Sequence, residues 1–166
     1  MEDKDKIDWS RFTVSMPLNL DQGVIIKAWT SQVGLEEWFL KLAEFTQPTG
    51  NQRNKKERIQ PGDAYKWTWH GWPDSIVEIG EVLPCKEGEF IRFTFGKTGT
   101  VSVKIIYLEN ETILQLIQEN IPQDEASKMN IYVGCKSGWT FYLLNLKSFL
   151  LGGPDLRNKN NKLQMD

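Results

Sequence analysis

The chain has 166 residues, of which 40% are hydrophobic and 25% are charged, and its formal net charge is −2. These values are ordinary for one globular domain, and they exclude the strongly basic surface that nucleic-acid binding requires. Two separated cysteines, Cys85 and Cys135, and a single histidine, His70, argue against a zinc site. No apolar run reaches the length of about 18 residues that a membrane-spanning helix needs.

The first eight residues are charged and lack an apolar stretch, so we expect no signal peptide. The default expectation is therefore a cytoplasmic protein with reduced thiols and no disulfide. Seven tryptophans stand out in the composition. Because an indole N–H needs a partner when it is buried, this number predicts either a large aromatic core or an aromatic-lined cavity.

Residues 10–16 alternate between apolar and polar side chains, with Phe12, Val14 and Met16 on one face, which predicts a strand ended by Pro17. Two short helices are expected next. Asn19 or Asp21 can cap the first, which carries Val24, Ile25, Ala28 and Trp29 at helical spacing. Ser31 can cap the second, which carries Leu35, Trp38 and Phe39.

Residues 47–62 change in character, since Gln47-Pro48-Thr49-Gly50 opens the segment and Pro61-Gly62 closes it. This composition predicts an exposed connection or a loose hairpin. A basic run occupies residues 53–58: Arg53, Lys55, Lys56 and Arg58. The run is interpreted as a solvated loop, with a grip on phosphate or on an acidic partner as the alternative.

The middle of the chain predicts a meander of antiparallel strands over residues 63–70, 75–83, 89–95, 100–108 and 112–120, separated by short turns. In the second of these strands, alternation places Val77, Ile79 and Leu83 toward the interior. The same alternation turns Glu81 inward, which conflicts with its charge, and a β-bulge near Gly80 would turn it outward.

The last element is a long helix that Asp124 or Ser127 can cap. Its apolar residues follow the i, i+3, i+4, i+7 pattern: Tyr132, Cys135, Trp139, Tyr142, Leu143, Leu146, Phe149 and Leu150. Gly152-Gly153-Pro154 ends it. We therefore expect an N-terminal tail over residues 1–9, one domain over residues 10–151, and a disordered polar tail over residues 152–166.

The order of elements predicts an α+β protein of the helix-grip type. A curved antiparallel β-sheet would wrap around the long C-terminal helix, with two short helices after the first strand. A sheet that closes around a helix in this way often leaves a cavity between the two, and a ligand would bind there.

Several motifs resemble the family of activators of the heat-shock protein 90 ATPase, within the larger START-like and birch-pollen-allergen-like superfamily. They are Pro17 with the helix running to Ala28-Trp29, Glu37-Trp38, Gly80-Glu81-Val82-Leu83-Pro84, and Gly138-Trp139 followed by Leu143, Leu146 and Leu150. The similarity extends over residues 10–151. It implies the helix-grip fold, and it adds a chaperone-associated stress-response role as a functional alternative.

The leading hypothesis is a non-enzymatic module that binds a small hydrophobic molecule between sheet and helix, with no cofactor and no metal. The wall candidates are Tyr65, Trp67, Trp69, Phe93, Val103, Tyr107, Trp139 and Leu143. The plainer interpretation of the aromatic strand face is core packing against the helix. A chaperone-associated protein and an enzyme of the cyclase or hydratase kind are the alternatives, and exposed tryptophans such as Trp9 or Trp72 would suit a homodimer face.

Three polar residues have a catalytic interpretation beside an ordinary one. His70 titrates near neutrality and could act as a general base, but strand alternation places it on the solvent side. Cys135 is expected to be a small apolar residue on a helix face, because no second histidine is present to activate it. Glu119 could serve as an acid–base group at a pocket mouth, although alternation leaves its direction open.

Overall fold

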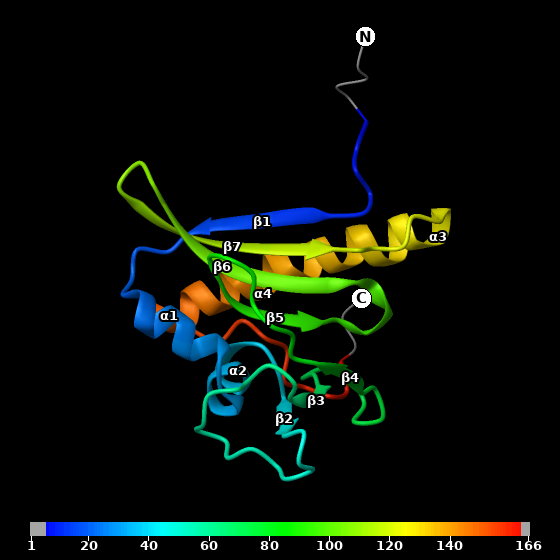
Figure 1. Cartoon of the computed structure of the whole chain (residues 1–166). Coiled ribbons are helices and arrows are strands. Elements are labelled where there is room, and N and C mark those ends of the chain that lie inside the picture. Colours follow the sequence, from blue (N-terminus) through cyan, green and yellow to red (C-terminus); the bar gives the residue numbers. More distant parts are fainter. Residues whose placement is uncertain (1–5, 164–166) are drawn as a thin grey trace.

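The computed structural model describes residues 6–163, so the ends of both predicted tails, residues 1–5 and 164–166, lie outside the described residues. The strands are β1 (Phe12–Pro17), β2 (Leu42–Thr46), β3 (Ala64–Thr68), β4 (Glu78–Glu81), β5 (Glu89–Thr94), β6 (Thr100–Leu108) and β7 (Glu111–Glu119). The helices are α1 (Gln22–Trp29), α2 (Gln32–Trp38), the single turn α3 (Glu125–Ser127) and α4 (Gly134–Leu150), with a π-helical segment (Lys128–Val133) between the last two (Figure 1).

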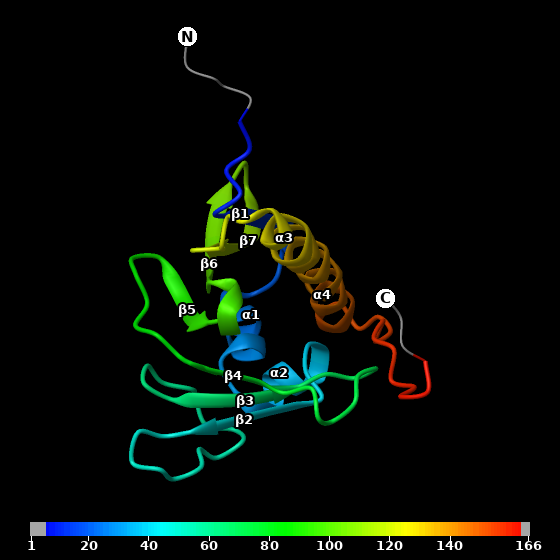
Figure 2. The same ribbon diagram turned by 90° about the vertical axis from the view of Figure 1, so that its right-hand side faces the viewer.

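All strand pairs are antiparallel, and the strands form two sheets with the orders β1-β7-β6-β5 and β2-β3-β4. The sheets meet where β4 approaches β5, because Val82 bridges Phe93 and the Leu83 amide donates to the Arg92 carbonyl at 2.8 Å. Figure 2 shows the resulting curve, with α4 along one face of the four-stranded sheet and α2 against the other sheet. The predicted α+β class is confirmed.

The two short helices begin where the sequence predicts. Asp21 caps α1 by accepting from the Gly23 amide at 2.9 Å, and Ser31 caps α2 by accepting from the Gly34 amide at 3.0 Å. The sequence analysis missed β2, which follows α2 after only three residues and pairs along its length with β3.

Strand β4 has the opposite phase to the prediction. Ile79 is 68% exposed, Glu81 is exposed, and Val82 is the buried residue of this stretch. The pairing of β3 with β4 has no register shift, so a bulge is not the cause. Gly80 lies opposite Tyr65, and the Tyr65 ring fills the space that a side chain at Gly80 would need. The Tyr65 ring of β3 therefore fills the interior at this position, and β4 contributes only its backbone there.

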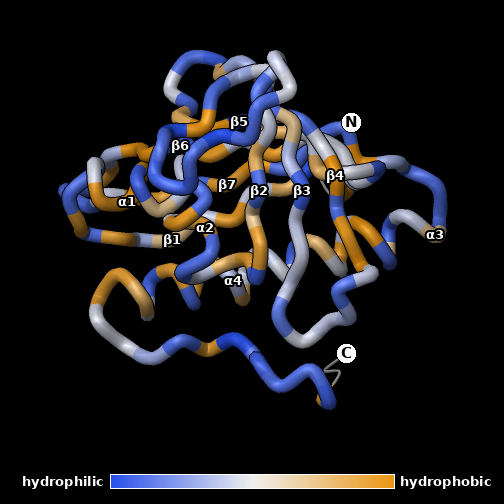
Figure 3. Tube along the Cα trace, turned by 90° about the horizontal axis from the view of Figure 1, so that it is seen from below, coloured by the Kyte–Doolittle hydropathy of each residue, from blue (hydrophilic) through white to orange (hydrophobic). Residues whose placement is uncertain are grey.

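The segment that follows α4 was expected to be disordered, and it packs against the domain instead. It is hydrophilic, as Figure 3 shows, yet Arg157 is only 9% exposed. Its guanidinium donates to the carbonyls of Glu36, Glu37 and Leu40 at 2.9–3.1 Å, where helix α2 ends with unpaired carbonyl groups. The prediction failed because composition does not reveal that a polar segment can cap a helix elsewhere in the chain.

A second polar anchor holds the same segment. The Asn145 side chain, fully buried on α4, donates to the Trp38 carbonyl at 2.7 Å and accepts from the Leu156 amide at 2.7 Å. Asp155 completes the contact by pairing with Arg157 at 2.8 Å. The C-terminal segment is thereby fixed across the end of α2 and beside α4.

The interior is filled mainly by aromatic rings. Trp29 lies edge-on to Trp38 with ring centroids 4.6 Å apart, and Tyr65 stacks on Trp67 at 3.8 Å. Phe39 contacts Trp139 of α4 at 5.0 Å and so connects the first helices to the last one. Such pairs add about 0.5–1.5 kcal/mol each beyond the area that they bury. The tryptophan-rich composition is therefore explained mainly by a packed aromatic core.

Candidate functional site

One pocket of about 220 Å³ remains open at the edge of this core, where the ends of β3 and β5 face α4. Its aromatic wall comes from four places in the chain: the residue after α2, the residue after β3, the residue after β5, and α4. We call it the aromatic pocket, and its lining residues are Phe39, Trp69, Phe95, Asn130, Gly134, Cys135, Gly138, Trp139 and Tyr142.

The α4 side of the aromatic pocket is kept open by two glycines one turn apart. Apart from its chain neighbours and the backbone of its own helix, a Cβ atom added to Gly134 or Gly138 would meet no atom of residues 6–163 within 4 Å. Glycine inside a helix costs about 0.5–1 kcal/mol relative to alanine, and no packing contact in the structure requires it at either position. The turn just before Gly134 is π-helical, a distortion that often marks functional sites. Together, the two glycines and the π-helical turn leave open space beside α4.

The polar groups around the aromatic pocket hold its wall in place. The Trp139 indole donates to the side-chain carbonyl of Gln118 at 2.9 Å, and the Gln118 amide donates to the Thr98 carbonyl at 2.9 Å. This chain fixes the plane of the Trp139 ring. Burial raises the pKa of the Cys135 thiol, so the thiol stays protonated near neutral pH and is a poor nucleophile.

Glu78 is a partly buried carboxylate near the aromatic pocket. Its carboxyl group packs against Gly96, the residue after Phe95, and it is near enough to Tyr65 and Cys135 to act on both electrostatically. Burial raises the pKa of Glu78. A partly desolvated acid at this place could accept a hydrogen bond from a bound molecule.

The eight wall candidates of the sequence analysis divide into three groups. Trp69 and Trp139 line the aromatic pocket. Five are at most 2% exposed within the packed core and line none of it: Tyr65, Trp67, Phe93, Val103 and Leu143. Tyr107 was expected to face inward, and it is 69% exposed near the end of the β6–β7 hairpin, where the sheet extends beyond the core.

The sequence analysis missed most of the pocket, namely Phe39, Phe95, Tyr142, Gly134 and Gly138. One signal was available: two glycines four residues apart inside an otherwise amphipathic helix, where alanine would fit better. The aromatic residues carry no comparable signal, because rings that line a gap and rings that fill a core have the same pattern.

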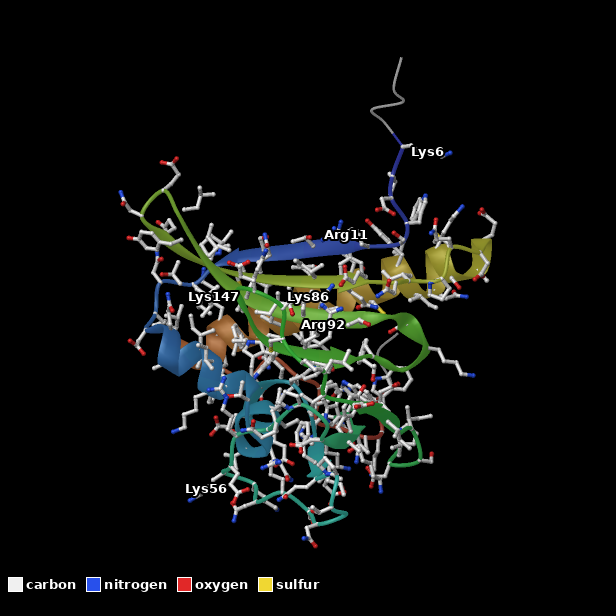
Figure 4. The ribbon with its side chains drawn as sticks, in the orientation of Figure 1. Lys6, Arg11, Lys56, Lys86, Arg92 and Lys147 are labelled. Carbon is white, nitrogen blue, oxygen red and sulfur yellow. The ribbon has the colours of Figure 1, made fainter. Side chains whose placement is uncertain are left out.

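Two of the other polar candidates have structural partners. Glu119 pairs with Arg92 at 3.3 Å and with Lys86 at 3.8 Å, and Figure 4 shows the two cations near one another. In the basic run, Arg53 forms a two-point ion pair with Asp63, whose side chain is fully buried. Arg53 is therefore a structural anchor, while Lys56 is exposed on the connection between β2 and β3 (Figure 4).

His70 lies outside the aromatic pocket and lines a neighbouring hollow with Gly71 and Trp72. Burial, together with the nearby charges of Arg157 and Lys159, lowers the pKa of His70. Among residues 6–163, no three His, Cys, Asp or Glu side chains lie together in a way that could hold a metal ion. Over the same part of the chain, no helix combines the length and the apolarity needed to cross a membrane.

An antiparallel sheet curved around a C-terminal helix, with a pocket between the two, defines a helix-grip protein. Solved structures share this fold. The protein SSP2350 from Staphylococcus saprophyticus is 14% identical with a TM-score of 0.65, over 89% of this chain and 96% of that one. The protein MLL2253 from Mesorhizobium loti is 16% identical with a TM-score of 0.64, over 87% and 98%.

A third structure, described as an Aha1 dimer from Colwellia psychrerythraea, is 14% identical with a TM-score of 0.61, over 83% of this chain and 93% of that one. No curated protein sequence matches the chain significantly. Residues 24–150 match the family model described as activator of Hsp90 ATPase homolog 1-like protein, and the chain belongs to this family. The resemblance seen in the sequence motifs is thereby confirmed.

Proposed function

We propose that this protein is a non-enzymatic binding module that holds a small apolar molecule in the aromatic pocket. The observation that carries the proposal is the open space beside Gly134 and Gly138, faced by aromatic side chains. A ligand that removes on the order of 200 Å² of apolar surface from water would gain about 5 kcal/mol. Ordering costs reduce this gain.

The size of the pocket limits the ligand. Small-molecule sites usually measure about 300–1,000 Å³, and the aromatic pocket offers about 220 Å³. The ligand is therefore either small or extends out of the pocket. Native mass spectrometry of protein purified from its natural host tests for a carried ligand. An extra mass that disappears on denaturation supports the proposal, and a bare mass at every ionisation setting counts against it.

Substitution of a pocket residue gives a second test. Trp69 is suited to it, because it lines the pocket at the end of a strand, whereas Trp67 is 1% exposed and its removal would damage the core. We expect Trp69→Ala to weaken binding of an uncharged fluorescent naphthylamine by about tenfold, which corresponds to about 1.4 kcal/mol. The exposed Tyr107→Ala is the matched control and should bind as the unmodified protein does. Equal affinity in both variants would refute the assignment.

A chaperone-associated role is the second candidate, and the family description supports it. It predicts that the purified protein binds a heat-shock protein 90 chaperone and raises the rate of ATP hydrolysis. An unchanged ATPase rate together with no binding in a pull-down would reject this role. Both candidate roles are compatible with the cytoplasmic location that the sequence analysis expects.

A homodimer is a proposal that the surface of α4 supports. Leu144 on the helix and Leu151 at its C-cap are 52% and 61% exposed, and their seven-residue spacing places them on one outward face. The Colwellia relative is described as a dimer. Light scattering behind size-exclusion chromatography should give twice the monomer mass, and Leu144→Glu should restore the monomer. A monomer at all concentrations would contradict the proposal.

An enzyme of the cyclase or hydratase kind is the third candidate, and Glu78 is the observation in its favour. It is a partly desolvated acid beside the pocket wall, and burial raises its pKa toward the range useful for proton transfer. A Glu78→Gln variant that binds ligand as well as the unmodified protein, with no product formed by either, would reject catalysis.

A further inference from the structure

A second and larger hollow adjoins the aromatic pocket. Its volume is about 560 Å³, and it lies between the turn after β3, the middle of α4 and the C-terminal segment. We call it the outer groove. It shares Gly138 and Tyr142 with the aromatic pocket, so the two hollows meet along the same turn of α4. A ligand too long for the aromatic pocket would extend into the outer groove.

The walls of the outer groove are partly apolar and partly basic. Trp72, Phe141 and Leu156 supply apolar surface, and the basic residues of the lining are His70 and Arg157, whose guanidinium is already bound to three backbone carbonyls and to Asp155. Within the part of the chain that the structure describes, no residue that lines the groove is an acid, and no residue that lines the aromatic pocket is basic. Along the pair of hollows, the lining therefore changes from aromatic at one end to mixed and basic at the other.

The charges near His70 come from three parts of the chain. Arg157 and Lys159 lie on the C-terminal segment, and Lys41 lies between α2 and β2. Asp155 opposes them and is itself bound to Arg157 at 2.8 Å and to Lys159 at 2.9 Å. Lys41 is bound to the exposed Asp74 at 2.5 Å. Among residues 6–163, these contacts thus bring three cations and two carboxylates together.

This arrangement leaves an excess of one positive charge among the described side chains around the outer groove. Positive charge at the mouth of a low-dielectric cleft attracts anions. Both burial and the cations lower the pKa of His70, which keeps its imidazole neutral near neutral pH. A bound anion would oppose both effects and favour the imidazolium form.

We propose that the outer groove binds the carboxylate head of an anionic amphiphile whose apolar chain lies in the aromatic pocket. This proposal rests on the proposed function, since it places the apolar chain of the ligand in the aromatic pocket. It adds the chemical class of the ligand and its orientation. The head lies beside His70 and the C-terminal segment, and the end of the chain points toward Trp139 and Phe95.

The test compares three probes with the same ten-carbon chain below their micelle concentrations: decanoate, decanol and decyltrimethylammonium. Calorimetric titration should give decanoate the highest affinity, about tenfold above decanol, and decyltrimethylammonium the lowest. The unique histidine offers an independent readout, because its imidazole gives a single set of NMR resonances. The pKa of His70 should rise when decanoate is bound and should stay unchanged with decanol.

Charge-removal variants locate the effect. Lys159→Gln, at a side chain that is 54% exposed, should weaken decanoate binding by about threefold and leave decanol binding unchanged. The matched control is Lys56→Gln on the β2–β3 connection, which Figure 2 places on the opposite side of the molecule from the C-terminal segment. This control should change neither affinity.

The outcomes separate the two proposals. If decanol and decanoate bind equally well and the pKa of His70 does not move, the proposed head-group site is wrong and the apolar pocket remains. If Lys56→Gln weakens decanoate binding as much as Lys159→Gln does, the attraction is unspecific, and the site is again wrong. If none of the three probes binds, the proposed function itself fails.

Discussion

Replacing Gly138 by alanine should make the protein more stable. Beyond its own helix backbone and chain neighbours, the added methyl group meets no atom of the described residues within 4 Å, so it causes no clash. Glycine inside a helix costs about 0.5–1 kcal/mol relative to alanine, and the unfolding free energy should rise by that amount. For a chain of this length, 1 kcal/mol corresponds to about 2–4 °C, so the melting temperature should rise by roughly 1–4 °C.

The same methyl group projects into the space that both hollows share. Ligand affinity should therefore fall as stability rises, and the larger Gly138→Leu should reduce affinity by more than about tenfold. Differential scanning calorimetry measures the first effect, and fluorescence titration with the uncharged naphthylamine measures the second. Opposite signs of the two changes are the signature of a glycine that is retained for an open site.

Gly153→Ala is the matched control, because a Cβ atom there would lie 2.7 Å from the Ser148 hydroxyl and 3.1 Å from its carbonyl oxygen. This variant should lose stability and bind ligand normally. A lower melting temperature for Gly138→Ala would show that the helix needs glycine for its backbone. Unchanged affinity in Gly138→Leu would show that no ligand uses the space, and either result refutes the reasoning.

Three further predictions concern the framework around the site. Arg157→Ala removes the hydrogen bonds to three carbonyl groups at the end of α2. Urea denaturation should show that the unfolding free energy falls by about 2–4 kcal/mol, and a fall of less than about 0.5 kcal/mol would contradict the anchoring role of Arg157. Hydrogen bonds from Arg157 hold the pKa of Asp155 well below its usual value. The stabilisation that this ion pair gives is therefore complete above about pH 4, and it is lost as the pH falls toward the folded-state pKa of Asp155. The reasoning would be refuted if the unfolding free energy of Arg157→Ala fell at acid pH in the same way as that of the unmodified protein. Gly80→Ala places a methyl group in the Tyr65 ring and should cost about 1–3 kcal/mol by calorimetry, and an unchanged melting temperature would exclude the close contact.

Much of the architecture could be predicted because its signals are local. The β6–β7 hairpin follows from two alternating runs around a turn in which Glu109 and Asn110 have positive φ values of 50° and 62°. The phase of β4 was not predictable in this way. Ile79 faces solvent because the Tyr65 ring occupies the interior opposite Gly80, and that fact depends on pairing between strands.

The site was predictable only in its general location. A cavity between sheet and helix follows from the fold, and Trp69 and Trp139 follow from alternation and helical spacing. Phe39 and Phe95 fall within the predicted helix and strand, and their periodicity does not distinguish a ring that lines a gap from one that fills the core. The role of Arg157 depends on carbonyl groups about 120 residues earlier in the chain, and no local pattern indicates such a contact.

The central claim is that apolar ligands bind beside Gly134 and Gly138, and amide NMR during titration with decanol tests it most directly. Glycine amides resonate in a distinct region, and the chain has 13 glycines, so the two can be followed individually. The account predicts saturable shifts at Gly134 and Gly138, with none at Gly50 and Gly88, which lie in exposed turns. Shifts confined to the outward face of α4, or no saturable shift at any residue, would contradict it.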